Sequence, residues 1–181
     1  RAIHADPAEY AEFMLATFQH MQEKYGFVPD TVEVLTEPEG TAEWNPVLLG
    51  QARAAMTARL KAAGFSPRLI APSVADARNA VPWLTGIAEV PGATENLSEL
   101  SYYRHRDGQR AVLEKIAATA AKLGLQTSML EHWGDEATDK VLYADLTGAN
   151  VAAWQGGSVA NFYRINPARP AGPLIARENV R

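Results

Sequence analysis

The chain has 181 residues, of which 47% are hydrophobic, enough to bury one sizeable core in a single domain or a large part of one. Its formal net charge of -4 argues against a nucleic-acid surface, because little in the sequence would neutralise a run of phosphates. No apolar run is long enough to cross a bilayer. The absence of cysteine excludes disulfides and thiolate chemistry. The first residue is Arg1 and not Met, so we expect the chain to derive from a longer protein, and a signal peptide would not be visible.

Three helices are predicted from their caps and from the helical spacing of apolar residues. An Asp-Pro and an Asn-Pro pair have the form of an N-cap followed by proline at the first helical position. They open helices predicted over residues 6–26 and 45–64, and a third helix is predicted over 108–124. Each of these segments ends at a glycine, the residue that most often closes a helix.

Strand-like apolar runs alternate with these helices. The predicted strands are 31–36, 68–71, 97–103, 127–130 and 150–154. Further helices are predicted over 73–90, with a capping box at Ser73 and Asp76 and a break at Pro82, and over 137–146. Alternating strands and helices predict an α/β fold with a mostly parallel sheet. Residues 156–181 are rich in Gly, Pro and Asn, and we expect an irregular C-terminal segment there.

Two glutamates close strand-like runs that lie far apart in the sequence. Glu37 follows residues 31–36 and precedes Pro38, and Glu131 follows residues 126–130. Catalytic groups of alternating strand-helix proteins lie at the carboxyl ends of parallel strands, so these two carboxylates suggest a shared site. Paired carboxylates are the catalytic groups of glycosidases. The sequence lacks the Gly-rich loops of nucleotide-binding open sheets, which favours part of a (β/α)8 barrel over a doubly wound sheet.

Several strand ends resemble those of clan A glycoside hydrolases, and of family 30 in particular. Leu35-Thr36-Glu37-Pro38 is similar to the Asn-Glu-Pro motif that ends the fourth strand, and Met129-Leu130-Glu131-His132 to the seventh strand, which carries the nucleophile. Ser101-Tyr-Tyr-Arg-His105 resembles the end of the sixth strand, and Trp154 stands where an eighth-strand tryptophan would.

The resemblance covers about residues 6–155 and has consequences for the fold. It implies a partial (β/α)8 TIM barrel with about five strand-helix units, strands four to eight in sequential order. Residues 1–181 would then be one portion of a catalytic domain, and the missing N-terminal barrel strands are expected in the full-length protein. Secretion is expected from the substrates of the family.

The resemblance also implies a chemistry. Glu37 would be the acid/base and Glu131 the nucleophile of a retaining enzyme that cleaves a β-linked oligo- or polysaccharide, with the two carboxyl groups about 5 to 5.5 Å apart. Tyr103 or His105 would supply hydrogen bonds that keep the nucleophile ionised. Further substrate-binding candidates share a polar or flat side chain near the strand ends: Thr36, Trp44, His132, Trp133 and Trp154.

Each candidate also has a packing interpretation. The histidines are equally compatible with hydrogen-bonded packing positions, and the tryptophans with core between sheet and helices. Glu39 is expected at the surface. The histidines show no metal-ligand spacing, and we expect neither a metal nor a cofactor.

Two departures from the family pattern leave alternatives open. Thr36 replaces the asparagine that precedes the acid/base, and Tyr103-Arg104-His105 replaces a His-x-Tyr pattern. Either change implies altered specificity or an inactive site. The alternatives to a glycoside hydrolase are therefore a barrel that binds carbohydrate without hydrolysis and an open-sheet domain that binds a small anionic ligand. Strand order distinguishes the last of these, because a doubly wound sheet reverses direction at a switch point.

Overall fold

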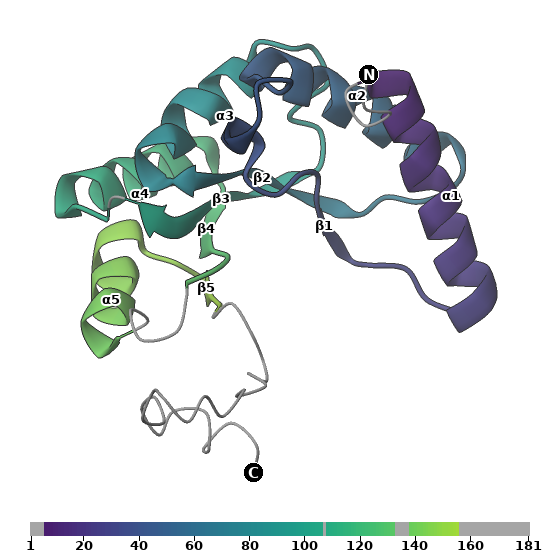
Figure 1. The fold of residues 1–181 in the computed structure, drawn as a ribbon. Coiled ribbons are helices and arrows are strands. Elements are labelled where there is room, and N and C mark those ends of the chain that lie inside the picture. Colours follow the sequence, from purple (N-terminus) through teal and green to yellow (C-terminus); the bar gives the residue numbers. More distant parts are fainter. Residues whose placement is uncertain (1–5, 107, 133–137, 156–181) are drawn as a thin grey trace, which may run out of the picture.

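The computed structural model describes residues 6–106, 108–132 and 138–155, which form one curled parallel sheet with helices on one side (Figure 1). The strands are β1 (Thr31–Glu33), β2 (Arg68–Asp76), β3 (Leu97–Arg106), β4 (Gln126–Met129) and β5 (Ala153–Trp154). They pair in sequence order, and every pairing is parallel. The sheet has no switch point, so these residues form part of a (β/α)8 barrel and not a doubly wound sheet.

The helices begin and end close to the residues that their caps predict. They are α1 (Pro7–Tyr25), α2 (Pro46–Ala62), α3 (Ala80–Ala88), α4 (Arg110–Leu123) and α5 (Asp139–Ala144). Shorter turns are the 3-10 helices η2 (Pro38–Gly40) and η3 (Ala77–Asn79) and the π-helix η5 (Asp145–Ala149). In α1, the Asp6 carboxylate accepts hydrogen bonds from two backbone N–H groups, and Gly26 closes the helix with a φ of 74°.

The predicted helix over residues 73–90 was wrong in its first half. Strand β2 continues through Asp76, because Val74 and Asp76 pair with Tyr102 and Arg106 of β3. Sheet pairing therefore overrides the local capping pattern, and Asp76 caps η3 instead. Pro82 lies in the first turn of α3, where its missing N–H is not needed by the helix.

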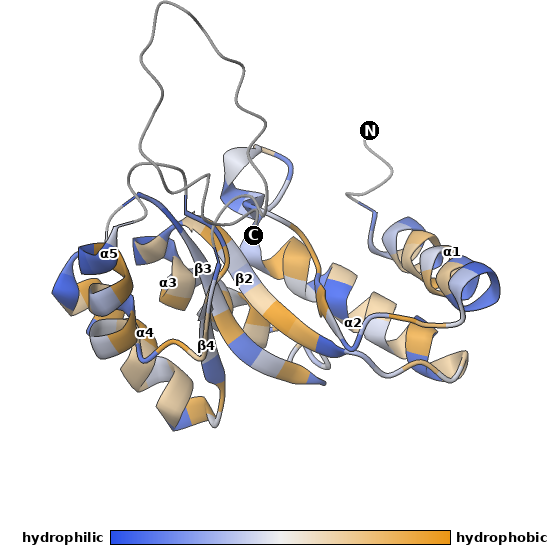
Figure 2. Cartoon of the chain, turned by 90° about the horizontal axis from the view of Figure 1, so that it is seen from below, coloured by the Kyte–Doolittle hydropathy of each residue, from blue (hydrophilic) through white to orange (hydrophobic). Residues whose placement is uncertain are grey.

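Two apolar clusters lie between the sheet and its helices. The N-terminal cluster joins α1 and α2 to the first two strands through residues such as Phe18, Val34 and Leu69. The C-terminal cluster joins α3 and α4 to the later strands through residues such as Tyr102 and Met129. Figure 2 shows the matching alternation of hydrophobic and hydrophilic residues along the strands. Side chains alternate along a strand, so the residues between these positions face the inside of the half-barrel.

Candidate active site

The turn after β1 fixes the backbone of Glu37. This residue has a φ of 48°, in the left-handed region that non-glycine residues rarely adopt. Its N–H donates to the carbonyl of Ser73 in β2 at 2.9 Å, and its carbonyl accepts from the N–H of Gly40 at 2.9 Å. Strained backbone that neighbouring strands hold in place is common at functional sites.

Glu39 helps to hold the same turn. Its Oε1 accepts a hydrogen bond from the N–H of Asp76 at 3.0 Å, which ties η2 to the end of β2. The expectation that Glu39 lies at the surface was therefore wrong, because its side chain is half-buried and bonded to the sheet. The turn that carries Glu37 thus has attachments to β2 on both sides.

His105 of β3 contacts the Glu37 carboxylate directly. Its Nε2 lies 2.8 Å from Oε1 of Glu37, and the two side chains are 21% and 36% exposed. The imidazole ring lies 5.4 Å from the ring of Tyr103, measured between centroids. Glu37 therefore combines a specific hydrogen-bond partner with access to solvent, as a group that transfers protons to a ligand requires.

Glu131 is the second residue after the end of β4, and its backbone stays close to β3. Its carbonyl accepts from the N–H of Arg104 at 3.1 Å, and the N–H of Leu130 donates to the carbonyl of Tyr102 at 2.9 Å, so the backbone pairing continues past β4. The side chain is half-buried, and its negative charge contributes to the raised pKa of Tyr103. Tyr103 and His105 thus link the surroundings of the two predicted catalytic glutamates.

A third glutamate, absent from the sequence-based site, lies beside them. The hydroxyl of Tyr103 donates to the Glu33 carboxylate, at 3.0 Å from Oε1 and 3.3 Å from Oε2. The hydroxyl of Thr36 donates to Oε2 of Glu33 at 3.0 Å. Both are strand-end residues that the sequence analysis assigned to substrate binding. The sequence did carry one signal for Glu33, which is its position. It is a charged residue between two valines whose side chains pack against the helices, so its own side chain faces the other side of the sheet.

The environment of Tyr103 favours its neutral form. Burial is the largest cause that raises the pKa of the phenol well above its usual range, and the charges of Glu33 and Glu131 raise it further, whereas Thr36 acts in the opposite direction. Tyr103 is therefore a neutral hydrogen-bond donor across the pH range in which most glycan-binding proteins work.

The aromatic candidates occupy packing positions. Trp44 is 8% exposed within the N-terminal cluster, and its ring meets that of Tyr10 edge-on at 6.5 Å. Trp154 packs against the C-terminal cluster, where its Nε1–H donates to Oδ2 of the buried Asp145 at 3.0 Å. The structure thus places both tryptophans on the helix-covered face. His132 is 5% exposed, and Trp133 lies outside the described residues.

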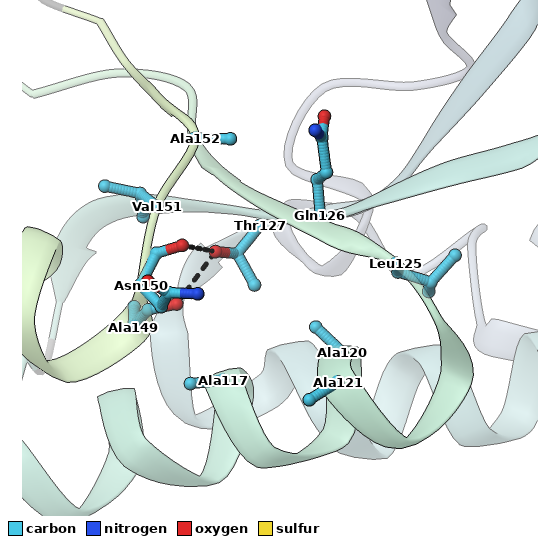
Figure 3. A pocket seen from close by; sticks show the side chains of 10 residues that line it. All are labelled: Ala117, Ala120, Ala121, Leu125, Gln126, Thr127, Ala149, Asn150, Val151 and Ala152. Atoms are coloured by element: carbon cyan, nitrogen blue, oxygen red, sulfur yellow. Dashed lines mark hydrogen bonds between the residues drawn. The ribbon is translucent and has the colours of Figure 1, made fainter.

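A separate cavity of about 310 Å³ lies between α4 and the segment that leads into β5 (Figure 3). Its walls carry several alanines, and the hydroxyl of Thr127 is within 2.8 Å of the carbonyls of Ala149 and Asn150. None of the predicted site residues lines this cavity. Within residues 6–106, 108–132 and 138–155, no cluster of three or more His, Asp or Glu side chains is arranged to hold a metal ion, and no helix has the length and apolarity of a membrane span.

Comparison with solved structures finds proteins that share this fold at low sequence identity. The similar structures include a conserved exported protein from Bacteroides fragilis, with a TM-score of 0.62, 16% identity and coverage of 83% of this chain and 41% of that chain. The catalytic domain of GH30 xylanase C from Talaromyces cellulolyticus has a TM-score of 0.61 at 14% identity, with 83% and 38% covered. An endo-β1,6-glucanase has a TM-score of 0.58 at 18% identity, with 82% and 37% covered.

The likeness covers only part of each of these proteins. The chain spans about two fifths of the length of each of these proteins. No family model matches the sequence, and no curated protein matches it either. At these identities the likeness establishes the fold alone, and the described residues have the architecture of a partial (β/α)8 TIM barrel.

Proposed function

We propose that this chain is the C-terminal portion of a retaining glycoside hydrolase that cleaves a β-linked oligo- or polysaccharide, with Glu37 as acid/base and Glu131 as nucleophile. The observation that carries the proposal is the arrangement around Tyr103 and His105. His105 contacts the Glu37 carboxylate, and the charge of Glu131 acts on Tyr103. Two carboxylates that follow the carboxyl ends of two strands, with Tyr103 and His105 on a strand between them, match the requirements of this chemistry.

In the first step, Glu37 donates a proton to the glycosidic oxygen while Glu131 attacks the anomeric carbon, giving a covalent glycosyl-enzyme. In the second step, Glu37 removes a proton from the water that hydrolyses this intermediate. With its proton on Nε2, His105 donates to Oε1 of Glu37, so the transferable proton belongs on Oε2. His105 would therefore orient the acid as well as contact it.

The structural neighbours support the substrate class in the proposal. Two of them are named as a xylanase and an endo-β1,6-glucanase, so both act on polysaccharides, and the name of the second gives a β linkage. We further propose that additional N-terminal strands pair with the edge of β1 in the full-length protein, because a closed barrel leaves no free strand edge. Secretion belongs to the same proposal.

Mechanism-based trapping tests this function directly. Full-length protein is incubated with activated 2-deoxy-2-fluoro-β-glycosides of glucose, xylose and other common sugars, and the labelled peptide is identified by mass spectrometry. The proposal predicts a single label on Glu131, abolished in Glu131→Gln. In Glu37→Gln, hydrolysis of natural glycans is lost, whereas turnover of substrates with good leaving groups is retained in part, because such groups need no acid. A label on another residue, or none with any sugar, overturns the assignment.

A second candidate function is glycan binding without hydrolysis. Thr36 favours it, because its short hydroxyl donates to Glu33 and offers no amide to a sugar hydroxyl. This alternative predicts saturable glycan binding in affinity electrophoresis, unchanged in Glu131→Gln, with no product released. Turnover that depends on Glu131 would exclude it.

A further inference from the structure

We propose that Glu33 is a positioning residue that fixes the direction of the Tyr103 hydroxyl, so that Tyr103 can only accept a hydrogen bond on the side of Glu131. This inference rests on the proposed role of Glu131 as nucleophile, but its main test does not require activity. The hydrogen bonds given above for the Glu33 carboxylate go to Tyr103 and Thr36, and not to Glu37 or Glu131.

The phenol of Tyr103 has a single proton to donate. Tyr103 donates that proton to the Glu33 carboxylate at 3.0 Å. A hydroxyl can donate only once, so toward every other group the phenol oxygen can only accept. An ionised Glu131 is also an acceptor without a proton to donate. The two oxygen groups therefore cannot bond to each other while Glu33 holds the phenol proton.

Thr36 helps to hold the Glu33 carboxylate in position. Its hydroxyl donates to Oε2 at 3.0 Å, which holds the carboxylate in place from the turn after β1. Glu33 therefore has a donor from each of two elements, β3 and the turn. The titratable groups that act on or contact Tyr103 are Glu33 on β1, His105 on its own strand and Glu131 after β4.

The consequence concerns the basicity of Glu131. A carboxylate that accepts a hydrogen bond from a phenol is stabilised, and its pKa falls. While Glu33 holds the phenol proton, Glu131 receives no such hydrogen bond from Tyr103. The sequence predicts that Tyr103 or His105 holds Glu131 ionised, and in the structure the proton of Tyr103 is donated to Glu33.

Two substitutions at position 33 separate this role from simple loss of charge. Glu33→Gln removes the charge but keeps an oxygen that accepts from Tyr103, whereas Glu33→Met removes both. The measurement is the titration midpoint of Glu131 by 13C NMR of the chain labelled at glutamate Cδ, with the signal assigned from Glu131→Gln. We expect the midpoint to be lower in Glu33→Met than in Glu33→Gln by about one pH unit. Equal midpoints in the two variants overturn the inference.

The Tyr103→Phe variant provides a second measurement that does not depend on the folding of Glu33→Met. If Tyr103 donates nothing to Glu131, its replacement leaves the midpoint of Glu131 unchanged to within a few tenths of a unit. A rise of about one unit in Tyr103→Phe would show that the phenol proton does reach Glu131, and would overturn the inference. When Tyr103→Phe is added to each of them, Glu33→Met and Glu33→Gln should give the same Glu131 midpoint.

Hydrolysis by the full-length protein supplies the link to function. The acidic limb of its pH profile should move to lower pH in Glu33→Met by the shift seen in the Glu131 titration, with a smaller movement in Glu33→Gln. If the wild-type protein does not hydrolyse glycans, the proposed function fails and the titration result still stands. If Glu33→Met and Glu33→Gln give the same Glu131 midpoint while the fluoroglycoside labels Glu131, the inference fails and the proposed function stands.

Discussion

Asp145 is the residue whose substitution should destabilise the fold most clearly. Its carboxylate is fully buried in η5, where it accepts from the hydroxyl of Tyr102 at 2.8 Å and from Nε1 of Trp154 at 3.0 Å. The guanidinium of Arg104 lies 3.6 Å away, and its side chain is 9% exposed. One carboxylate thus connects η5 to β3 and β5 and balances a buried positive charge.

The expected cost of Asp145→Asn follows from these contacts. The asparagine keeps the shape of the side chain, but its NH2 group faces either the Tyr102 hydroxyl or Trp154 Nε1, both of which are donors. It also leaves the charge of Arg104 buried without its counterion. Removing one member of a buried ion pair costs about 3 to 5 kcal/mol, and a hydrogen bond to a charged acceptor contributes about 1.5 to 3 kcal/mol. These terms overlap, so we expect a total loss of about 3 to 5 kcal/mol in the free energy of unfolding.

Urea denaturation of the chain, followed by tryptophan fluorescence, measures this loss. With a slope of about 2 kcal/mol per molar urea, the midpoint should fall by roughly 2 M. The matched control is Asp139→Asn, the same change at an exposed position in the first turn of α5, which should cost no more than about 1 kcal/mol. A loss below about 1 kcal/mol in Asp145→Asn would refute the reasoning.

Three further predictions concern close packing and titration. In Gly108→Ala, the new Cβ would lie 1.4 Å from Nη1 of Arg104, so the guanidinium must shift from its place beside Asp145. We expect a loss of about 1 to 3 kcal/mol in the free energy of unfolding that is not additive with the loss in Asp145→Asn, and no comparable loss in Gly40→Ala, where the space is open. In Gly50→Ala, the new Cβ would meet Val90 Cγ2 at 2.8 Å and the carbonyl of Ile87 at 3.0 Å, which should force α2 and α3 apart and lower the melting temperature by several degrees; an unchanged melting temperature would contradict this. Burial raises the pKa of three of the six tyrosines well above the usual value, so their contribution to stability is complete below about pH 10 and is lost as pH rises above it. They are Tyr10, Tyr102 and Tyr103. Absorbance at 295 nm should show that these three ionise only with unfolding; six tyrosines that titrate together in the folded chain would refute this prediction.

The sequence predicted the order of elements better than the orientation of side chains. Helix ends at Asp6 and Gly26 follow from local capping chemistry, which the chain carries within a few residues. The extension of β2 to Asp76 depends on pairing with β3, a partner that local patterns around Ser73 do not reveal. The aromatic candidates show the same limit, because the face on which Trp154 lies depends on Asp145 and on the register with β4.

The strand ends indicate where the candidate site lies, and the catalytic roles of its residues stay a prediction. Glu37 and Glu131 lie where those runs end, and His105 and Tyr103 lie between them. Glu33 was missed because a charge inside a three-residue strand has no local motif, and its role depends on a hydroxyl 70 residues away in the sequence. Contacts of this kind arise only when the sheet curls.

The central claim is that Glu37 and Glu131 act as a pair on one glycosidic bond. A crystal structure of the full-length protein would measure the separation of their carboxyl groups directly. The account predicts about 5 to 5.5 Å, with both groups facing one cavity. A separation above about 10 Å, or side chains that point to opposite ends of the sheet, would contradict it.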